Sequence, residues 1–224
     1  MTMKDLSVSE AYFLCAVQNK GKIFGYDTAK VTCLMAAVLH EMKQSGLITF
    51  SDRKILLTNS TADQTAYLLP VWEHLKESEN LDYKHILQDY NSGWSDRHLN
   101  ALTSAIGTGL AEQGLVTRAK LGIFGGRTYF MPYKDAIPAL AAELQVNILY
   151  QTPFPMQDGF LWILLEKSGC IPQILPEDQR ESIRKKVTFS IQNEPEGELS
   201  EFTEFTDKLL TIAKAGTVFV NYES

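Results

Sequence analysis

The same local pattern occurs twice in this chain: a helix-like apolar stretch ends at a glycine, and a short strand-turn-strand segment follows. The first copy comprises Leu39–Ile48 and Thr49–Thr58, and the second comprises Leu110–Val116 and Leu121–Phe130. The glycine falls where a helix ends in a left-handed residue, a conformation that residues with a Cβ adopt only at a cost. The extended run and turn that follow predict a β-hairpin. Units of helix, glycine stop and hairpin occur in winged-helix modules and in helical domains that present hairpins at a surface.

The charge balance disfavours nucleic acid as the partner. The 224 residues carry 21 Lys and Arg against 27 Asp and Glu, which gives a formal net charge of -6. A duplex-binding domain usually has a clustered positive excess, because neutralisation of phosphates supplies most of its affinity. No global excess exists here, although a local basic patch stays open as an alternative.

Apolar periodicity predicts a mainly α fold: one compact helical domain over residues 1–224 with two short hairpins, near 50–58 and near 119–131. Ser7 or Ser9 is expected to cap the first helix, and Asp27 the second. Further helices are predicted over 67–75, 83–90, 94–110, 137–150, 160–168, 176–186 and 205–214. No signal peptide or membrane-spanning run is present in this sequence, which predicts a cytoplasmic protein with at most peripheral membrane contact.

The sequence offers no recognisable catalytic or metal-binding motif, so we predict no enzyme activity, no cofactor and no metal. The cysteines are widely spaced and are expected to be buried thiols in a reducing compartment; they are Cys15, Cys33 and Cys170. None of the four histidines stands in a nucleophile or zinc-protease motif. His74 and His85 flank a polar loop and are predicted to face solvent.

Several short motifs, in this order and spacing, resemble the Golgi phosphoprotein 3-like domain over about Leu6–Val187. The motifs are Leu6-Ser7-x-x-Glu10, Asn19-Lys20-Gly21-Lys22-Ile23, Leu39-x-Glu41, Gly46-Leu47-Ile48, Leu110-x-Glu112-x-Gly114-Leu115-Val116, Leu121-Gly122-Ile123-Phe124 and the run from Tyr129 to Pro132. The resemblance implies a single helical domain that associates peripherally with membranes. It also implies recognition of a phosphoinositide headgroup and a β-hairpin whose apolar tip enters the bilayer.

Carried over by position, the family's hairpin corresponds to Ala119–Phe130, and its headgroup aromatic corresponds to Tyr26. The apolar tip would be formed by Leu121, Ile123 and Phe124. The family's basic headgroup positions are not kept, since they fall on Met35, Asn100 and Thr103, and the basic N-terminal arm of eukaryotic members is missing. The chain therefore resembles a divergent bacterial member of the family.

Three cations surround the predicted tip: Arg118, Lys120 and Arg127. Basic residues that frame exposed apolar ones suit an anionic bilayer, where each contributes about 1 kcal/mol. The alternative is that the apolar residues of this hairpin pack as core, as apolar residues in strands usually do.

Three functions follow from these patterns. The preferred prediction is a non-enzymatic protein of a membrane surface, with anionic lipid as partner and a protein partner or self-association in addition. A rival is a tandem winged-helix regulator whose recognition helices would be Asp27–Gln44 or Asp96–Ala111. These segments carry few cations, namely Lys30, Lys43 and Arg97, whereas recognition helices contact phosphates and base edges with polar and basic side chains. A scaffold that binds only protein is the third possibility.

Overall fold

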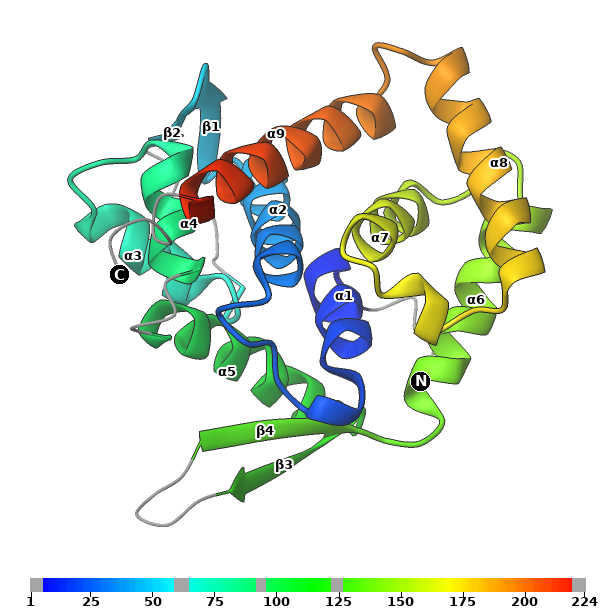
Figure 1. Ribbon diagram of the computed structural model, residues 1–224, viewed down its shortest axis with the longest axis horizontal. Helices are drawn as coiled ribbons and strands as arrows, with labels where there is room; N and C mark the ends of the chain where they lie inside the picture. Colours follow the sequence, from blue (N-terminus) through cyan, green and yellow to red (C-terminus); the bar gives the residue numbers. More distant parts are fainter. Residues whose placement is uncertain (1–5, 59–64, 92–95, 122–126, 219–224) are drawn as a thin grey trace.

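The computed structural model describes residues 6–58, 65–91, 96–121 and 127–218, and within them the chain is mainly helical (Figure 1). The elements of these residues are α1 (Val8–Val17), η2 (Gln18–Lys20), α2 (Thr28–Gln44), β1 (Ile48–Ser51), β2 (Lys54–Leu57), α3 (Leu69–Glu77), α4 (Tyr83–Asn91), α5 (Arg97–Glu112), β3 (Val116–Leu121), β4 (Arg127–Pro132), α6 (Ala136–Tyr150), α7 (Met156–Lys167), η3 (Ile171–Gln173), α8 (Glu177–Asn193) and α9 (Glu198–Val218). The strands form two separate antiparallel pairs, β1–β2 and β3–β4. The predicted mainly α fold with two hairpins is confirmed.

Local chemistry fixes the ends of the first helices. Ser7 caps α1 with a complete capping box, in which its side chain accepts from the Glu10 N–H and the Glu10 carboxylate accepts from the Ser7 N–H at 3.0 Å. The side chain of Asp27 caps α2. Gly46 and Gly114 follow α2 and α5 with φ of 71° and 73°, so both predicted glycine stops are left-handed residues.

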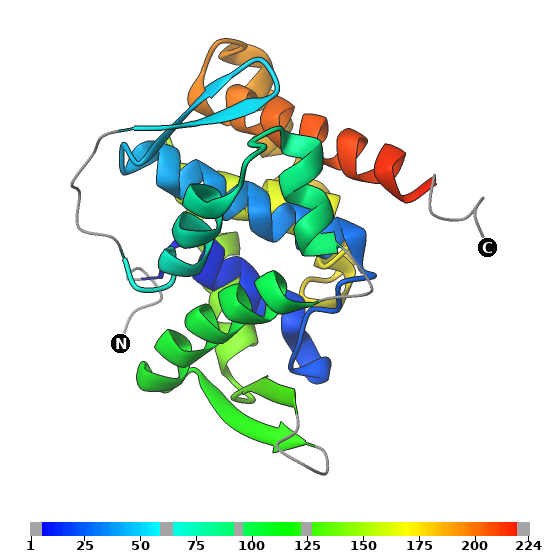
Figure 2. The ribbon, with the colours of Figure 1, turned by 90° about the vertical axis from the view of Figure 1, so that its left-hand side faces the viewer.

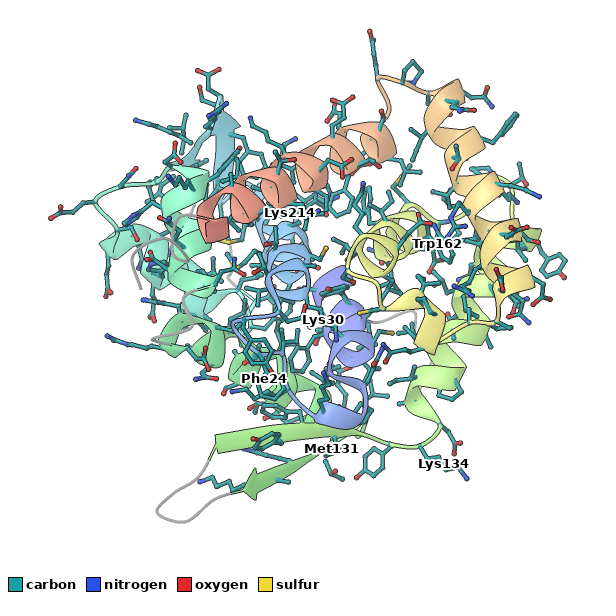
Figure 3. All side chains as sticks on the ribbon, in the orientation of Figure 1. Phe24, Lys30, Met131, Lys134, Trp162 and Lys214 are labelled. Atoms are coloured by element: carbon teal, nitrogen blue, oxygen red, sulfur yellow. The ribbon has the colours of Figure 1, made fainter. Side chains whose placement is uncertain are left out.

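The centre of the molecule is built around α1 and α2. All ten residues of α1 are buried, because the helix packs against α2, α5 and α7. The long helix α9 crosses α2 at one end of the molecule, and α6 and α8 lie on the far side of α7 (Figure 1). Trp162 of α7 is fully buried in this core (Figure 3). The three cysteines are also buried and unpaired, as predicted.

The second hairpin extends away from the helical body (Figure 2). Its register runs from Val116 opposite Pro132 to Leu121 opposite Arg127. Phe130 anchors the base of the hairpin, since its N–H donates to the Gly21 carbonyl at 2.7 Å and its ring lies directly on Gly107. A Cβ added at Gly107 would lie 2.5 Å from the Phe130 ring, so the close approach of β4 to α5 requires a glycine.

The helices α8 and α9 extend beyond their predicted bounds. The charged helix was expected to end at Lys186 but continues to Asn193, because Val187 is buried and Ile191 packs against the core. The last helix begins at Glu198 rather than near Phe205, since burial of Leu199 and Phe202 extends it toward the N-terminus.

Candidate functional site

A small polar cavity of about 180 Å³ lies at the base of the second hairpin. Residues from α1, the segment after η2, α5 and β4 line it: Phe13, Gly21, Lys22, Asn100, Thr103, Ser104, Thr128 and Phe130. The apolar part of the wall is the edge-to-face pair of Phe13 and Phe130, whose ring centroids are 6.2 Å apart. The rest of the wall offers an ammonium, hydroxyls and an amide. We call this cavity the hairpin pocket.

Lys22 gives the hairpin pocket its charge. Its side chain is only 6% exposed, and its Nζ lies 3.6 Å from the Asp96 carboxylate. Within the described residues the buried Nζ has no hydrogen-bond acceptor, although it lies 5.1 Å from the centre of the Phe24 ring. Asp96 therefore balances the charge of this ammonium without accepting a hydrogen bond from it, and a buried donor of this kind favours an acceptor at its side.

Neutral donors face the same space. The side chains of Asn100, Ser104 and Thr128 line the pocket and make no hydrogen bond to another described residue. The Thr103 hydroxyl donates to the Leu99 carbonyl at 2.8 Å, so it offers lone pairs rather than a proton. One ammonium with three neutral donors can accept a small oxyanion, because phosphate oxygens are strong acceptors.

The structure brings some of the positions implied by the resemblance together and separates others. Asn100 and Thr103 both line the hairpin pocket. Met35 of α2, the third of these positions, is fully buried in the core and cannot reach a ligand. Lys22 was missed as a candidate site residue, because the run Asn19-Lys20-Gly21-Lys22-Ile23 was used only as a motif of the resemblance. Gly21 is the residue in that run that could have indicated a buried Lys22. It is left-handed, with φ of 64°, and turns the chain so that Lys22 points inward.

Tyr26, the predicted headgroup aromatic, does not line the pocket but lies close to it. The ring is 74% exposed and stacks on Phe24 with centroids 5.2 Å apart. Phe24, labelled in Figure 3, is the same ring that Lys22 contacts. Phe24 therefore connects the segment that holds Tyr26 to the pocket, and a role of Tyr26 at a headgroup stays a prediction.

Of the three cations predicted to surround the hairpin tip, the structure describes the side chains of Arg118 and Lys120. Arg118 and Lys120 of β3 are exposed, and they pair with Phe130 and Thr128. Directly opposite residues of an antiparallel pair share one face, so both cations lie on the face that also forms the pocket wall. Arg127 is described through its backbone alone, opposite Leu121. The side chains of these two residues lie outside the described residues, as do the whole of Ile123, Phe124, Gly125 and Gly126.

One histidine prediction is wrong. His74 is 8% exposed rather than solvent-facing, because α3 packs this side chain toward α4 and α5. Its ring stacks on His98 at 3.9 Å, and its Nε2 lies 3.1 Å from the Asp89 carboxylate. Burial, followed by the neighbouring His98, lowers the pKa of His74. His85 is about half exposed, as predicted.

The buried surface of α2 excludes one version of the winged-helix alternative. Every residue from Val31 to Met42 is buried, so α2 cannot enter a DNA groove as a recognition helix. Among the described residues, no group of three or more His, Cys, Asp or Glu side chains could hold a metal ion. None of the helices in the described ranges has the length and apolar character needed to cross a bilayer.

The fold and the pocket together define a class of protein: a helical domain with a projecting β-hairpin and a cation-containing polar pocket at the base of that hairpin. The sequence profile of the Golgi phosphoprotein 3 (GPP34) family matches residues 8–199, and the chain belongs to this family. The resemblance seen in the short motifs is thereby confirmed. No curated protein matches the chain.

Proposed function

We propose that this chain is a non-enzymatic peripheral protein of an anionic membrane surface, and that the hairpin pocket receives the phosphorylated headgroup of a lipid. The buried Lys22 ammonium, which lacks a hydrogen-bond acceptor within the described residues, is the observation that carries the proposal. A lipid phosphate would supply that acceptor and would take further hydrogen bonds from Asn100, Ser104 and Thr128.

The position of the pocket supports a membrane ligand over a free one. The hairpin projects from the body, and its exposed Arg118 and Lys120 share a face with Thr128 of the pocket wall. A bilayer that attracts these cations would therefore present its headgroups at the pocket entrance. Each cation near an anionic surface adds about 1 kcal/mol, so the two would raise binding to any anionic bilayer.

The donor set predicts modest headgroup selectivity. A guanidinium recognises a phosphomonoester through two parallel hydrogen bonds, whereas an ammonium acts as a point charge. Among the described residues that line the hairpin pocket there is no Arg, and Lys22 is the one cation. We therefore expect a preference for phosphorylated over unphosphorylated lipids, with little discrimination between phosphate positions on the inositol ring.

Vesicle flotation with paired lysine variants tests the proposal. Lys22→Met removes the pocket ammonium, whereas Lys20→Met removes an exposed ammonium two residues away and is the matched control. Hydrogen bonds to charged groups contribute about 1.5–3 kcal/mol, so Lys22→Met should weaken binding to phosphatidylinositol-monophosphate vesicles by roughly 10- to 100-fold. Lys20→Met should change it less than about threefold.

A second pair of changes separates headgroup binding from general attraction. Arg118→Gln with Lys120→Gln should lower binding to phosphatidylserine and phosphoinositide vesicles alike and should flatten its salt dependence. Circular dichroism and melting curves would show that each variant is folded. If Lys22→Met and Lys20→Met bind phosphoinositide vesicles equally well, the pocket does not hold the headgroup. If the parent floats with neither type of anionic vesicle, membrane binding itself is wrong.

A further inference from the structure

A larger groove of about 560 Å³ lies at the opposite end of the molecule from the hairpin pocket. It is bounded by α2, the β1–β2 hairpin, α4 and α9, which cluster away from β3 and β4 (Figure 1). The Golgi phosphoprotein family match ends at residue 199, so most of the α9 wall lies beyond the matched segment. We call it the α9 groove.

Aromatic rings form one wall of the α9 groove. Phe50 and Phe205 are stacked with centroids 4.7 Å apart, and Tyr83 meets both edge-on at 5.8 and 6.0 Å. Two lysine ammonium groups already lie over these rings, Lys43 at 5.9 Å from Phe50 and Lys208 at 5.2 Å from Tyr83. The wall is therefore suited to cations, which the negative faces of aromatic rings attract.

The charged residues of the groove leave a surplus of carboxylates. Its lining holds the acids Asp52, Glu198, Glu201 and Glu204 against the bases Lys43 and Lys208, which leaves a formal charge of about -2. Lys43 pairs with Glu201 at 4.0 Å. Within the described part of the chain, the carboxylates of Asp52 and Glu204 have no cationic partner. The groove therefore favours a cationic ligand.

His40, at one end of the groove, has a buried ring nitrogen with no hydrogen-bond partner among the described residues. His40 is 8% exposed and lies between Phe160 and Phe202, with ring centroids at 4.6 and 4.8 Å. Its Nε2 makes no hydrogen bond to a described residue, and the nearest carboxylate oxygen, Oε1 of Glu198, is 3.9 Å away. Burial lowers the pKa of His40, so the ring is neutral at pH 7.

The neutral His40 ring and Glu198 can share a donor. When Nδ1 carries the proton, Nε2 is an acceptor that faces the Glu198 carboxylate, another acceptor. A nitrogen placed about 2.8 Å from both atoms would give Nε2 its missing hydrogen bond and would give Oε1 of Glu198, which already accepts from the Gln44 amide at 3.0 Å, a second one. An ammonium group is such a donor, since it carries three N–H bonds and a positive charge.

We propose that the α9 groove binds a linear aliphatic polyamine. One ammonium group would lie between His40 and Glu198, and another would reach Glu204. These two glutamates are six residues apart on α9, which separates them by about 9 Å along the helix axis. The methylene chain between the ammonium groups would cross the stacked rings of Phe50 and Phe205 and shield their apolar faces from water. This site is independent of the proposed headgroup pocket.

Calorimetric titration of the full chain with spermidine, at constant ionic strength, tests the inference. The parent should bind one spermidine per chain with saturation. Glu198→Gln combined with Glu204→Gln should weaken the affinity about 2- to 30-fold, the combined effect of losing two ion pairs at an exposed site. Glu177→Gln with Asp178→Gln is the matched control: it removes the same charge from the first turn of α8, outside the groove, and should leave the affinity unchanged.

The aromatic wall has its own variant. Phe205→Leu keeps an apolar side chain but removes the flat ring over which the methylene chain would lie, and should weaken spermidine binding about threefold to fivefold. Melting curves would show that the variants are folded. The proposal is overturned if the groove double variant and the α8 control double variant weaken spermidine binding equally, because the attraction would then come from the net negative charge of the whole chain. It is also overturned if Mg²⁺ at equal ionic strength displaces spermidine completely, or if the parent binds no spermidine at low salt.

Discussion

Two glycines of α5 should respond in opposite ways to the same substitution. A Cβ added at Gly107 would lie 2.5 Å from three atoms of the Phe130 ring, which is too close for any real contact. A Cβ added at Gly109 would meet only the Glu10 carboxylate at 3.7 Å, an ordinary contact distance. Since both positions lie inside one helix, alanine improves the helix propensity at each by about 0.8–1 kcal/mol.

The packing around Gly107 decides whether Gly107→Ala raises or lowers the stability of the protein. Inserting a methyl group into a well-packed core costs about 1–3 kcal/mol, so Gly107→Ala should change stability by between about 0 and -2 kcal/mol. Gly109→Ala carries no such cost and should stabilise by about 0.5–1 kcal/mol. The two variants should therefore differ by roughly 1–3 kcal/mol, or about 2–12 °C in melting temperature for a chain of this size.

Urea and thermal unfolding of both variants measure this difference, and hydrogen exchange at β4 shows whether the hairpin loosens. In a Phe130→Leu background, Gly107→Ala should lower the free energy of unfolding much less than it does in the parent, because the clashing ring is gone. If Gly107→Ala proves as stable as Gly109→Ala, Phe130 does not lie on α5 as described, and the anchoring of the hairpin would need another explanation.

Two pH-dependent predictions complete the set. Burial raises the pKa of Glu41 to about 7 from 4.5, so its contribution to stability is full below about pH 4.5 and is lost as the pH rises toward 7. Glu41→Gln removes this pH dependence. Its free energy of unfolding, measured with urea, should therefore rise by up to about 3 kcal/mol relative to that of the parent between pH 5 and pH 8. Burial lowers the pKa of His74, so its contribution is full above about pH 6.5 and is lost as the pH falls. His98→Phe should raise that pKa in an NMR titration, and an unchanged His74 pKa would mean that the stacked pair is uncoupled.

The parts of the fold that local chemistry determines could be predicted from the sequence. Ser7 and Glu10 form a capping box because both partners lie within one turn. Gly46 and Gly114 end their helices because a left-handed residue is needed there, and the hairpins follow directly. These features depend on neighbours a few residues away, which is the range that a sequence pattern expresses.

The parts that depend on distant contacts could not be predicted. Lys22 becomes a pocket residue through Asp96, Phe130 and the wall of α5, all far from it in sequence. His74 is buried because α3 packs on α5, although its own segment has the composition of a solvated surface. The start of α9 was missed for the same reason, since burial of Leu199 outweighs the polar character of the preceding segment.

The position of α9 has a consequence for synthesis of the chain. This helix covers α2, and the Gln44 amide donates to the Glu198 carboxylate at 3.0 Å across 154 residues of sequence. At roughly 5–20 residues per second, the ribosome needs about 8–30 s to make the intervening segment. During that interval the nascent chain has no α9 to cover α2, and exposed apolar surface of this kind attracts chaperones. The synthesis of α9, rather than the emergence of the first two helices, therefore sets the moment at which the core closes.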